Sequence, residues 1–163
     1  MLARIIGVFK LDSKTFEEIE HNVSLTLSAA LIVVVVSLVS GLGNGIFKVI
    51  TGKPFFNGFI GSLIATILGW LLWSVVTWFV GTRFFKGKAD LGEMLRVIGF
   101  AYSPMVISII PCIGPIIGAI WAIVAGFIAI RQGLDLDNTK TFFTVVVGAF
   151  FFIVLWVILS ILI

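Results

Sequence analysis

Gly99-Phe-Ala-Tyr-Ser-Pro104-Met-Val-Ile-Ser-Ile-Ile110-Pro-Cys-Ile-Gly-Pro115 is the stretch that decides how this chain folds. It is apolar enough to lie in a membrane, yet it contains three prolines, two glycines, a tyrosine and two serines. Unpaired backbone groups are costly in hydrocarbon, so irregular backbone at membrane depth normally lies against protein or a wet cavity. We therefore expect this stretch to lie at the centre of the molecule.

The composition of the whole chain identifies the class of protein. Hydrophobic residues make up 60% of the 163 residues and charged residues only 12%, about half the charged share of a soluble domain. A bilayer admits helical bundles or closed barrels, and barrel strands alternate apolar and polar residues. Runs such as Leu31-Ile-Val-Val-Val-Val36 are continuously apolar. We therefore predict an all-α, polytopic α-helical membrane protein.

The apolar runs predict a cytoplasmic interfacial or amphipathic segment, residues 1–23, and a five-helix transmembrane domain, residues 24–163. The expected transmembrane spans are about 24–47, 58–85, 97–110, 116–130 and 142–163. The third and fourth spans measure only about 21 to 23 Å at 1.5 Å per residue, against a hydrocarbon core of about 30 Å. Either their ends extend into the neighbouring residues, or the pair forms a re-entrant hairpin.

The N-terminal segment has two parts. Residues 1–11 are apolar with two cations, which suits a segment in the membrane interface or a hydrophobic terminus packed on the bundle. Asp12-Ser13 predicts a helix start, and Thr15-x-x-Glu18 predicts a capping box one turn later. Helical spacing places Phe16, Ile19 and Val23 on one face, with Glu17, Glu18 and Glu20 on the other. Asp90-x-x-Glu93 predicts a second helix start before the third span.

The distribution of lysine and arginine predicts the orientation. Residues 1–23 contain three, residues 83–96 four and residues 131–141 two. Residues 48–57 contain two, and the proline turn and the C-terminus contain none. Nine against two places the N-terminus in the cytoplasm and the C-terminus outside. The eight acidic residues share the cytoplasmic side, and this near-balance of charge disfavours a nucleic-acid partner or a polybasic lipid-binding patch.

The sequence offers little that could carry catalysis. No expected span contains an interior Asp, Glu, Lys, Arg or His, which argues against a pump or a proton-coupled transporter. The only histidine, His21, and the only cysteine, Cys112, fall on opposite sides of the expected topology. Asp135-x-Asp137-Asn138 lacks the glycine and the distal glutamate of a calcium loop, so we expect it to cap the fifth span. We predict no enzyme activity, no cofactor and no metal site.

Small residues recur every four positions on two of the spans: Gly61, Ala65 and Gly69, then Gly114, Gly118, Ala122 and Gly126. Such spacing lets helix backbones approach closely. Packing within the chain is favoured over a homodimer seam. Trp70 and Trp73 fall near the middle of the second span, and we expect them to fill space against glycine-rich helices with each indole N–H bonded to a carbonyl or hydroxyl.

The central hairpin, Leu95-Arg-Val-Ile-Gly-Phe-Ala-Tyr-Ser-Pro104 followed by Ile110-Pro111, Ile113-Gly114 and Ile120-Trp121, resembles the Yip family of Rab-interacting membrane proteins. Lys14-Thr-Phe-Glu-Glu-Ile19 and Ile130-Arg-Gln-Gly-Leu-Asp-Leu-Asp-Asn-Thr-Lys140 agree with it. The resemblance implies five spans, a cytoplasmic N-terminus and membership of the prokaryotic branch in the plasma membrane. Eukaryotic members bind prenylated Rab-type GTPases. A GTPase partner is disfavoured here because their long N-terminal region with its Asp-Leu-Tyr-Gly-Pro motif is missing, and their Gly-Tyr pair becomes Gly99-Phe100.

These observations predict a non-enzymatic membrane-organising scaffold or partner-binding protein, acting on membrane lipids, as a homo-oligomer or with another membrane protein. The alternative is a lipid or small-solute conduit whose groove is lined by Tyr102, Ser103, Ser108, Ser37 and Asn44. The candidate motif consists of Gly99, Tyr102, Ser103, Pro104, Pro111, Gly114 and Pro115. This stretch either grips a partner, lines a path or only shapes the bundle. Pro104 removes one helical donor, which predicts a kink near Ala101 whose freed carbonyl is met by Ser103, Tyr102 or a neighbouring helix.

Overall fold

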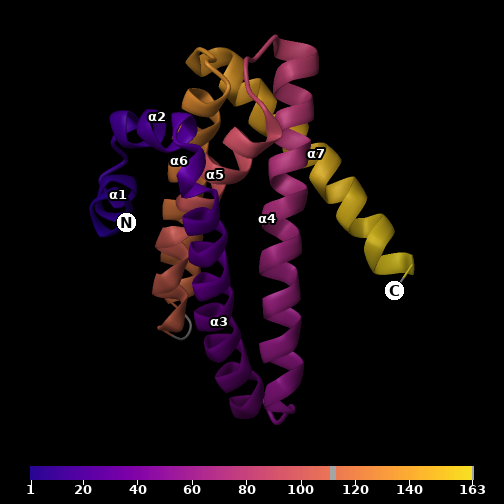
Figure 1. Ribbon diagram of the computed structural model, residues 1–163. Coiled ribbons are helices and arrows are strands. Elements are labelled where there is room, and N and C mark those ends of the chain that lie inside the picture. Colours follow the sequence, from indigo (N-terminus) through magenta and orange to yellow (C-terminus); the bar gives the residue numbers. More distant parts are fainter. Residues whose placement is uncertain (111–112, 163) are drawn as a thin grey trace.

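The computed structural model describes the backbone of residues 1–110 and 113–162, and this part of the chain forms helices and no strand (Figure 1). In chain order the elements are α1 (Leu2–Phe9), α2 (Ser13–His21), η1 (Val23–Leu25), α3 (Thr26–Ile50), α4 (Phe55–Phe85), α5 (Leu91–Ala101), η2 (Ser103–Ile109), α6 (Gly114–Gly133) and α7 (Asn138–Leu162). The predicted all-helical class is confirmed. Among the residues that the structure describes, three helices are long and apolar enough to cross a membrane: Val23–Ile50, Phe55–Phe85 and Gly114–Gly133.

α3 and α4 form the long antiparallel pair that runs the length of the molecule (Figure 1). The turn between them contains Gly52 in the left-handed region, at φ 73°, a conformation that glycine adopts without strain. Pro54 then precedes the first residue of α4 and cannot continue a preceding helix. Both helices extend beyond the expected spans, α3 by three residues at its end and α4 by three at its start.

The third expected span is broken where the sequence predicts. α5 ends at Ala101, and the chain continues as the 3₁₀ segment η2, in which Pro104 is the second residue. Proline cannot donate a backbone hydrogen bond and clashes with the preceding helical turn, so the α-helix stops before it. The predicted break near Ala101 is confirmed. The Ser103 hydroxyl, however, has no hydrogen-bond partner among the described residues, so it does not cap the broken helix.

The fourth expected span is longer than predicted. α6 contains 20 residues, about 30 Å at 1.5 Å per residue, which is enough to cross the hydrocarbon core. Its start recruits Gly114 and Pro115 of the central stretch, and its end recruits Arg131 to Gly133. Pro111 and Cys112 lie outside the described residues.

α1 and α2 form an arm that packs on the side of the bundle; we call it the α1–α2 arm, residues 2–21 (Figure 1). In α1 the Val8 side chain is fully buried, and the Phe9 carbonyl accepts a hydrogen bond of 3.1 Å from the Trp121 indole N–H on α6. In α2 the Phe16 and Ile19 side chains are fully buried in the core. The alternative of a terminus packed on the bundle therefore describes residues 1–11.

Two details of α2 differ from the prediction. Asp12 is the N-cap, and the Thr15 hydroxyl inside the helix donates to its carboxylate at 2.8 Å, so the Thr15–Glu18 capping box is wrong. Glu18 instead pairs with Arg4 of α1, whose Nε lies 3.0 Å from its carboxylate. Glu20 is only 4% exposed and lies on the buried face, not with Glu17 and Glu18 on the outer one.

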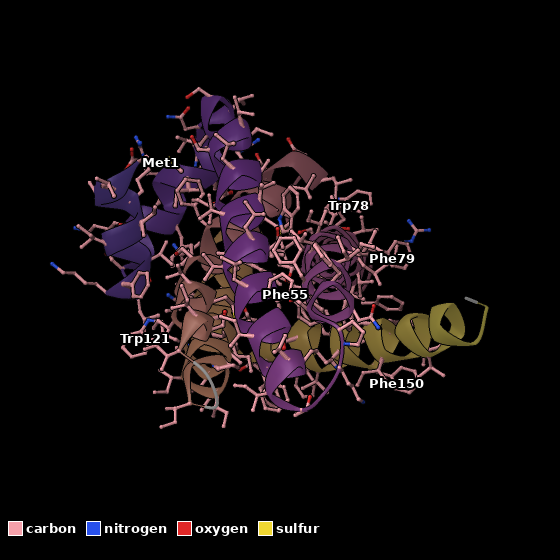
Figure 2. The ribbon with its side chains drawn as sticks, turned by 90° about the horizontal axis from the view of Figure 1, so that it is seen from below. Met1, Phe55, Trp78, Phe79, Trp121 and Phe150 are labelled. Atoms are coloured by element: carbon pink, nitrogen blue, oxygen red, sulfur yellow. The ribbon has the colours of Figure 1, made fainter. Side chains whose placement is uncertain are left out.

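α7 begins beside the other helices and then diverges from them (Figures 1 and 2). Asp137 caps its first turn as predicted, since its carboxylate accepts a hydrogen bond of 2.8 Å from the Lys140 backbone N–H. The Thr141 and Thr144 side chains are fully buried in the first turns, whereas Phe150 is 65% exposed further along. The apolar stretch Asn138–Val154 forms the first part of this helix, which continues to Leu162.

Candidate functional site

The broken third span creates the main hollow region of the molecule. A cavity of about 470 Å³ lies between α4, α5, α6 and α7, and a second of about 360 Å³ lies between α4 and α7. They share four lining residues, Tyr102, Met105, Phe152 and Ile153. We call the two together the apolar cleft, because its walls are almost entirely hydrocarbon and aromatic side chains. The divergence of α7 leaves it open.

A third cavity, of about 290 Å³, lies on the other side of η2, between α3, α4 and the start of α6. Hydroxyl and amide groups from three helices reach into it: Ser40, Asn44, Ser62, Thr66 and Ser108. We call it the polar cavity. The Ser40 and Ser108 hydroxyl groups lie 2.8 Å apart, and the Asn44 amide donates to the Ser62 hydroxyl at 3.1 Å.

Met105 lines all three cavities. It is the third residue of η2, and the end of α5 at Ala101 gives this side chain its central position. The break in the third span therefore places a flexible thioether between two apolar chambers and a polar one. In the sequence, Met105 carries no signal of this position beyond its place directly after Pro104.

Some residues of the candidate motif pack helices together, and others line the cavities. A Cβ at Gly99 would lie 2.9 Å from the Ala29 Cβ and 3.3 Å from the Trp70 indole nitrogen, so α5 approaches α3 and α4 closely there. Tyr102 lines the apolar cleft, and Pro115 lines the polar cavity. Ser103 and Pro104 are buried and line none of the three cavities.

The small residues of α6 serve two purposes. A Cβ at Gly114 would collide with the Ile107 carbonyl oxygen, and one at Gly118 would lie 3.2 Å from the Pro104 carbonyl oxygen. These two glycines therefore pack within the chain, as predicted, against η2. Ala122 and Gly126 instead line the apolar cleft, and a Cβ at Gly126 would meet no atom of the described residues within 4 Å. The prediction of packing within the chain is wrong for Gly126.

The small residues of α4 divide in the same way. A Cβ at Gly61 would also meet no atom of the described residues within 4 Å, so this residue makes no close packing contact with them and the prediction is wrong for it. Ala65 and Gly69 line the apolar cleft. A Cβ at Gly69 would lie 3.7 Å from the Tyr102 hydroxyl, an ordinary van der Waals distance.

The two tryptophans of α4 hold neighbouring helices. The Trp70 indole N–H donates to the Leu95 carbonyl at 3.1 Å, which fits the prediction of a bonded indole against a glycine-rich helix. Trp73 lines the apolar cleft and contacts the Phe152 ring edge to face, with the ring centroids 5.6 Å apart. Gly148 of α7 packs beside Trp73.

The remaining residues of the proposed conduit do not form one groove. Ser108 and Asn44 line the polar cavity, whereas Tyr102 lines the apolar cleft. The Ser37 hydroxyl donates to the Val34 carbonyl of its own helix at 2.7 Å. Ser40 and Ser62 were missed by the sequence analysis, although Ser40 belongs to the small, polar end of the first span.

The end of the bundle where α3 and α5 begin contains a buried cation. Arg96 is 3% exposed, and its Nε and Nη2 donate to the Glu20 main-chain carbonyl at 3.1 and 2.6 Å. Its Nη1 lies 3.5 Å from the Thr26 hydroxyl. On α6, Arg131 donates to the Ser13 hydroxyl at 2.7 Å and to the Asn138 side chain at 3.0 Å. Two arginines thus fasten α2 to the bundle.

The His21 and Asp137 side chains form local hydrogen bonds within or at the start of their own helices. The His21 ring lies 2.9 Å from the Glu17 carbonyl oxygen, and this hydrogen bond raises the pKa of the imidazole. The hydrogen bond from the Lys140 backbone N–H lowers the pKa of Asp137, as expected for a helix cap. Within residues 1–110 and 113–162, no group of three His, Cys, Asp or Glu residues is placed to hold a metal ion.

Comparison with known proteins agrees with the resemblance seen in the sequence. The family model described as the Yip1 domain matches residues 6–161, which is nearly the whole chain. No curated protein and no solved structure matches the chain. The apolar helices and this match together show a membrane protein. The chain therefore belongs to the Yip1-domain family.

Proposed function

We propose that this protein is a non-enzymatic membrane scaffold that associates with a second copy of itself through the apolar cleft. The observation that carries the proposal is the small-residue lining of an open cleft. Ala122 and Gly126 of α6 and Ala65 and Gly69 of α4 line it at four-residue spacing. Small residues at this spacing let the backbone of another helix approach closely, which a lipid chain does not require.

The divergence of α7 supplies the helix for such contact. Toward its end α7 diverges from the other helices, as Figures 1 and 2 show, although Phe152 and Ile153 still line the apolar cleft of their own chain. Two copies related by a two-fold axis would each lay α7 across the cleft of the other. This arrangement is isologous, so one surface serves both copies, and closed two-fold dimers are the commonest oligomers. The scaffold would act by holding such pairs in the membrane.

Counting fluorophores per particle in liposomes at low protein-to-lipid ratio tests this proposal. The label is attached to a Lys53→Cys variant in which Cys112 is replaced by Ser. We expect two-step photobleaching for this protein and a roughly tenfold weaker association for Gly126→Leu, since a tenfold change corresponds to about 1.4 kcal/mol. Val124→Phe is the matched control, because Val124 is exposed on α6 and lines none of the three cavities. A strictly monomeric protein at all densities would overturn the proposal, as would equal association of the two variants.

We further propose the orientation given by the charge distribution, with the α1–α2 arm in the cytoplasm of a prokaryotic cell and the C-terminus outside. Nine of the eleven cations lie in the arm, around α5 and between α6 and α7. Labelling of Lys10→Cys and Lys53→Cys, each with Cys112 replaced by Ser, with an impermeant maleimide in intact cells tests it. Labelling of the cysteine at position 53 alone is expected, and labelling of position 10 alone would reverse the orientation.

A second candidate function is a conduit for lipid or a small polar solute. One observation favours it: among the residues that the structure describes, Met105 alone lines the polar cavity and both parts of the apolar cleft. A flexible side chain at that position can separate or connect the chambers. Liposomes containing the purified protein are the test, with lipid scrambling and solute flux as readouts. Met105→Ala should increase transport and Met105→Trp should block it, and no transport by the unaltered protein rules this function out.

A further inference from the structure

The α1–α2 arm contains a buried carboxylate that no part of the proposed scaffold uses. Glu20 is 4% exposed as a whole residue, and its carboxylate makes no hydrogen bond or ion pair with the residues that the structure describes, although its oxygen atoms keep some contact with solvent. Arg96, the nearest buried cation in the hydrogen-bond network, bonds to the main-chain carbonyl of Glu20 instead. A buried charge without a partner is costly, so such a group is more stable when it is neutral.

The charges that act on Glu20 come from α2 itself, from α5 and from the turn after α6, while Arg4 of α1, which also packs against α2, is paired with Glu18. Glu17 and His21 lie on α2 itself, Glu93 and Arg96 lie on α5, and Asp135 follows α6. Burial raises the pKa of the Glu20 carboxyl to about 7; His21 acts against this rise, while Asp135, Glu93 and Glu17 add to it. Arg131 of α6 is turned away toward Ser13 and Asn138.

The position of α2 decides the position of α1. The Arg4–Glu18 ion pair ties α1 to α2, and α1 in turn packs against η2 and α6, where the Trp121 indole bonds to the Phe9 carbonyl. Figure 2 shows Trp121 on the same side of the bundle as α1. Whatever loosens α2 therefore loosens the cover over η2, the segment that shapes all three cavities.

We propose that the α1–α2 arm is a proton-controlled clamp on η2, in which protonation of Glu20 favours the docked arm and ionisation of Glu20 favours its release. The direction of the pH effect follows from the thermodynamic linkage between proton binding and docking of the arm. The docked arm binds the proton more tightly than the released arm, in which the carboxyl returns toward its ordinary value of 4.5. The docked arm is thus most stable below about pH 4.5 and loses stability as pH rises to about 7, by up to about tenfold in the docking equilibrium per pH unit. The proposal does not depend on dimer formation, because the clamp and the apolar cleft use different residues.

Pulsed electron paramagnetic resonance of the full chain in nanodiscs tests the clamp. Spin labels on Lys14→Cys and Lys88→Cys report α2, and labels on Lys10→Cys and Lys88→Cys report the end of α1, both with Cys112 replaced by Ser. These lysines are exposed. We expect the fraction of the short, docked distance to rise as pH falls from 7.5 to 5 for both pairs.

Two variants separate Glu20 from its neighbours. Glu20→Gln keeps the shape and removes the charge, so its docked fraction should be the same at both pH values. Glu17→Gln, on the exposed side of the same helix, should keep the pH response. A distance distribution independent of pH in the unaltered Glu20 background overturns the clamp, and so does a full pH response in Glu20→Gln. If a variant fails to fold, hydrogen exchange of the natural sequence replaces it. After correction for intrinsic exchange rates, the α1 and α2 amides should be more protected at pH 5 than at pH 7.5.

Discussion

The Ser40 and Ser108 hydroxyl groups lie 2.8 Å apart where α3 meets η2, and they join residues 68 positions apart in the chain. Both side chains are buried. A Cβ at Gly43, one turn along α3 from Ser40, would lie 2.8 Å from the Ser108 carbonyl oxygen, so the two backbones approach closely at this point. This contact, together with the Gly114 and Gly118 contacts on α6, holds the irregular segment inside the bundle.

Ser108→Ala is expected to loosen η2. The change leaves the Ser40 hydroxyl without its partner, and hydrogen bonds between membrane helices average about 0.6 kcal/mol with a maximum of about 1.7. The expected loss of unfolding free energy lies in that range and can be measured by thermal unfolding in detergent. Ser37→Ala is the control, because the Ser37 hydroxyl bonds only within its own helix and its loss should change stability little. Equal losses of unfolding free energy in the two variants would show that the Ser40–Ser108 hydrogen bond does not stabilise the fold.

Gly99→Ala and Gly126→Ala are expected to change stability in opposite directions. The Cβ at position 99 would lie 2.9 Å from the Ala29 Cβ, and overpacking of a tight core costs typically about 1 to 3 kcal/mol. The Cβ at position 126 would meet nothing within 4 Å, so the variant should gain roughly the 0.8 to 1.0 kcal/mol by which alanine exceeds glycine in a helix. The two unfolding temperatures measured side by side check this. A destabilised Gly126→Ala would mean that the cleft is filled.

The break in the third span follows from sequence because it depends on one residue, Pro104, whose effect is local. The helix starts at Asp12, Asp90 and Asp137 can be predicted from the sequence for the same reason, since each cap involves residues no more than three positions away. The contacts between residues on different helices could not be predicted from the sequence. Spacing alone places Gly118 and Gly126 on one face of α6, yet η2 covers the first and an open cleft lies over the second.

Glu20 shows a second limit of sequence reasoning. Placing it with Glu17 and Glu18 follows the usual preference of carboxylates for solvent. The helix geometry nevertheless sets Glu20 beside Ile19 and one turn after Phe16, on the face that α5 and α6 cover. Arg96 bonds to the Glu20 main-chain carbonyl, a contact over 76 positions that no local pattern encodes.

Arg96→Ala is expected to destabilise the docking of α2. The change removes both donors to a buried carbonyl, and a buried acceptor left without a partner costs about 1 to 3 kcal/mol. Arg96→Lys should recover only part of this loss, because an ammonium group does not present two fixed donors to one acceptor. Protection of Lys10 and Lys14 from trypsin in nanodiscs is the measurement. Arg83→Ala, on the exposed end of α4, should leave that protection unchanged, and cleavage no faster in Arg96→Ala would contradict the role given to this arginine.

Asp12→Asn is expected to change the acid side of the pH profile of α2, where the sign is opposite to that of Glu20. The hydrogen bond from the Thr15 hydroxyl lowers the pKa of Asp12 below its ordinary value of 3.8. A lowered pKa means that the cap stabilises the helix above about pH 3.8 and that this stabilisation is lost as pH falls through the lower, folded-state value. Docking of α2 should therefore weaken again in strong acid, after strengthening between pH 7 and 4.5. The spin-label pair at positions 14 and 88 measures the docked fraction both between pH 7 and 4.5 and in strong acid.

In Asp12→Asn, which still accepts hydrogen bonds at the cap but has no charge to lose, the acid limb, meaning the loss of docking in strong acid, should flatten. The change between pH 7 and 4.5 that Glu20 causes should stay. If the acid limb is unchanged in this variant, the weakening in strong acid belongs to another carboxylate.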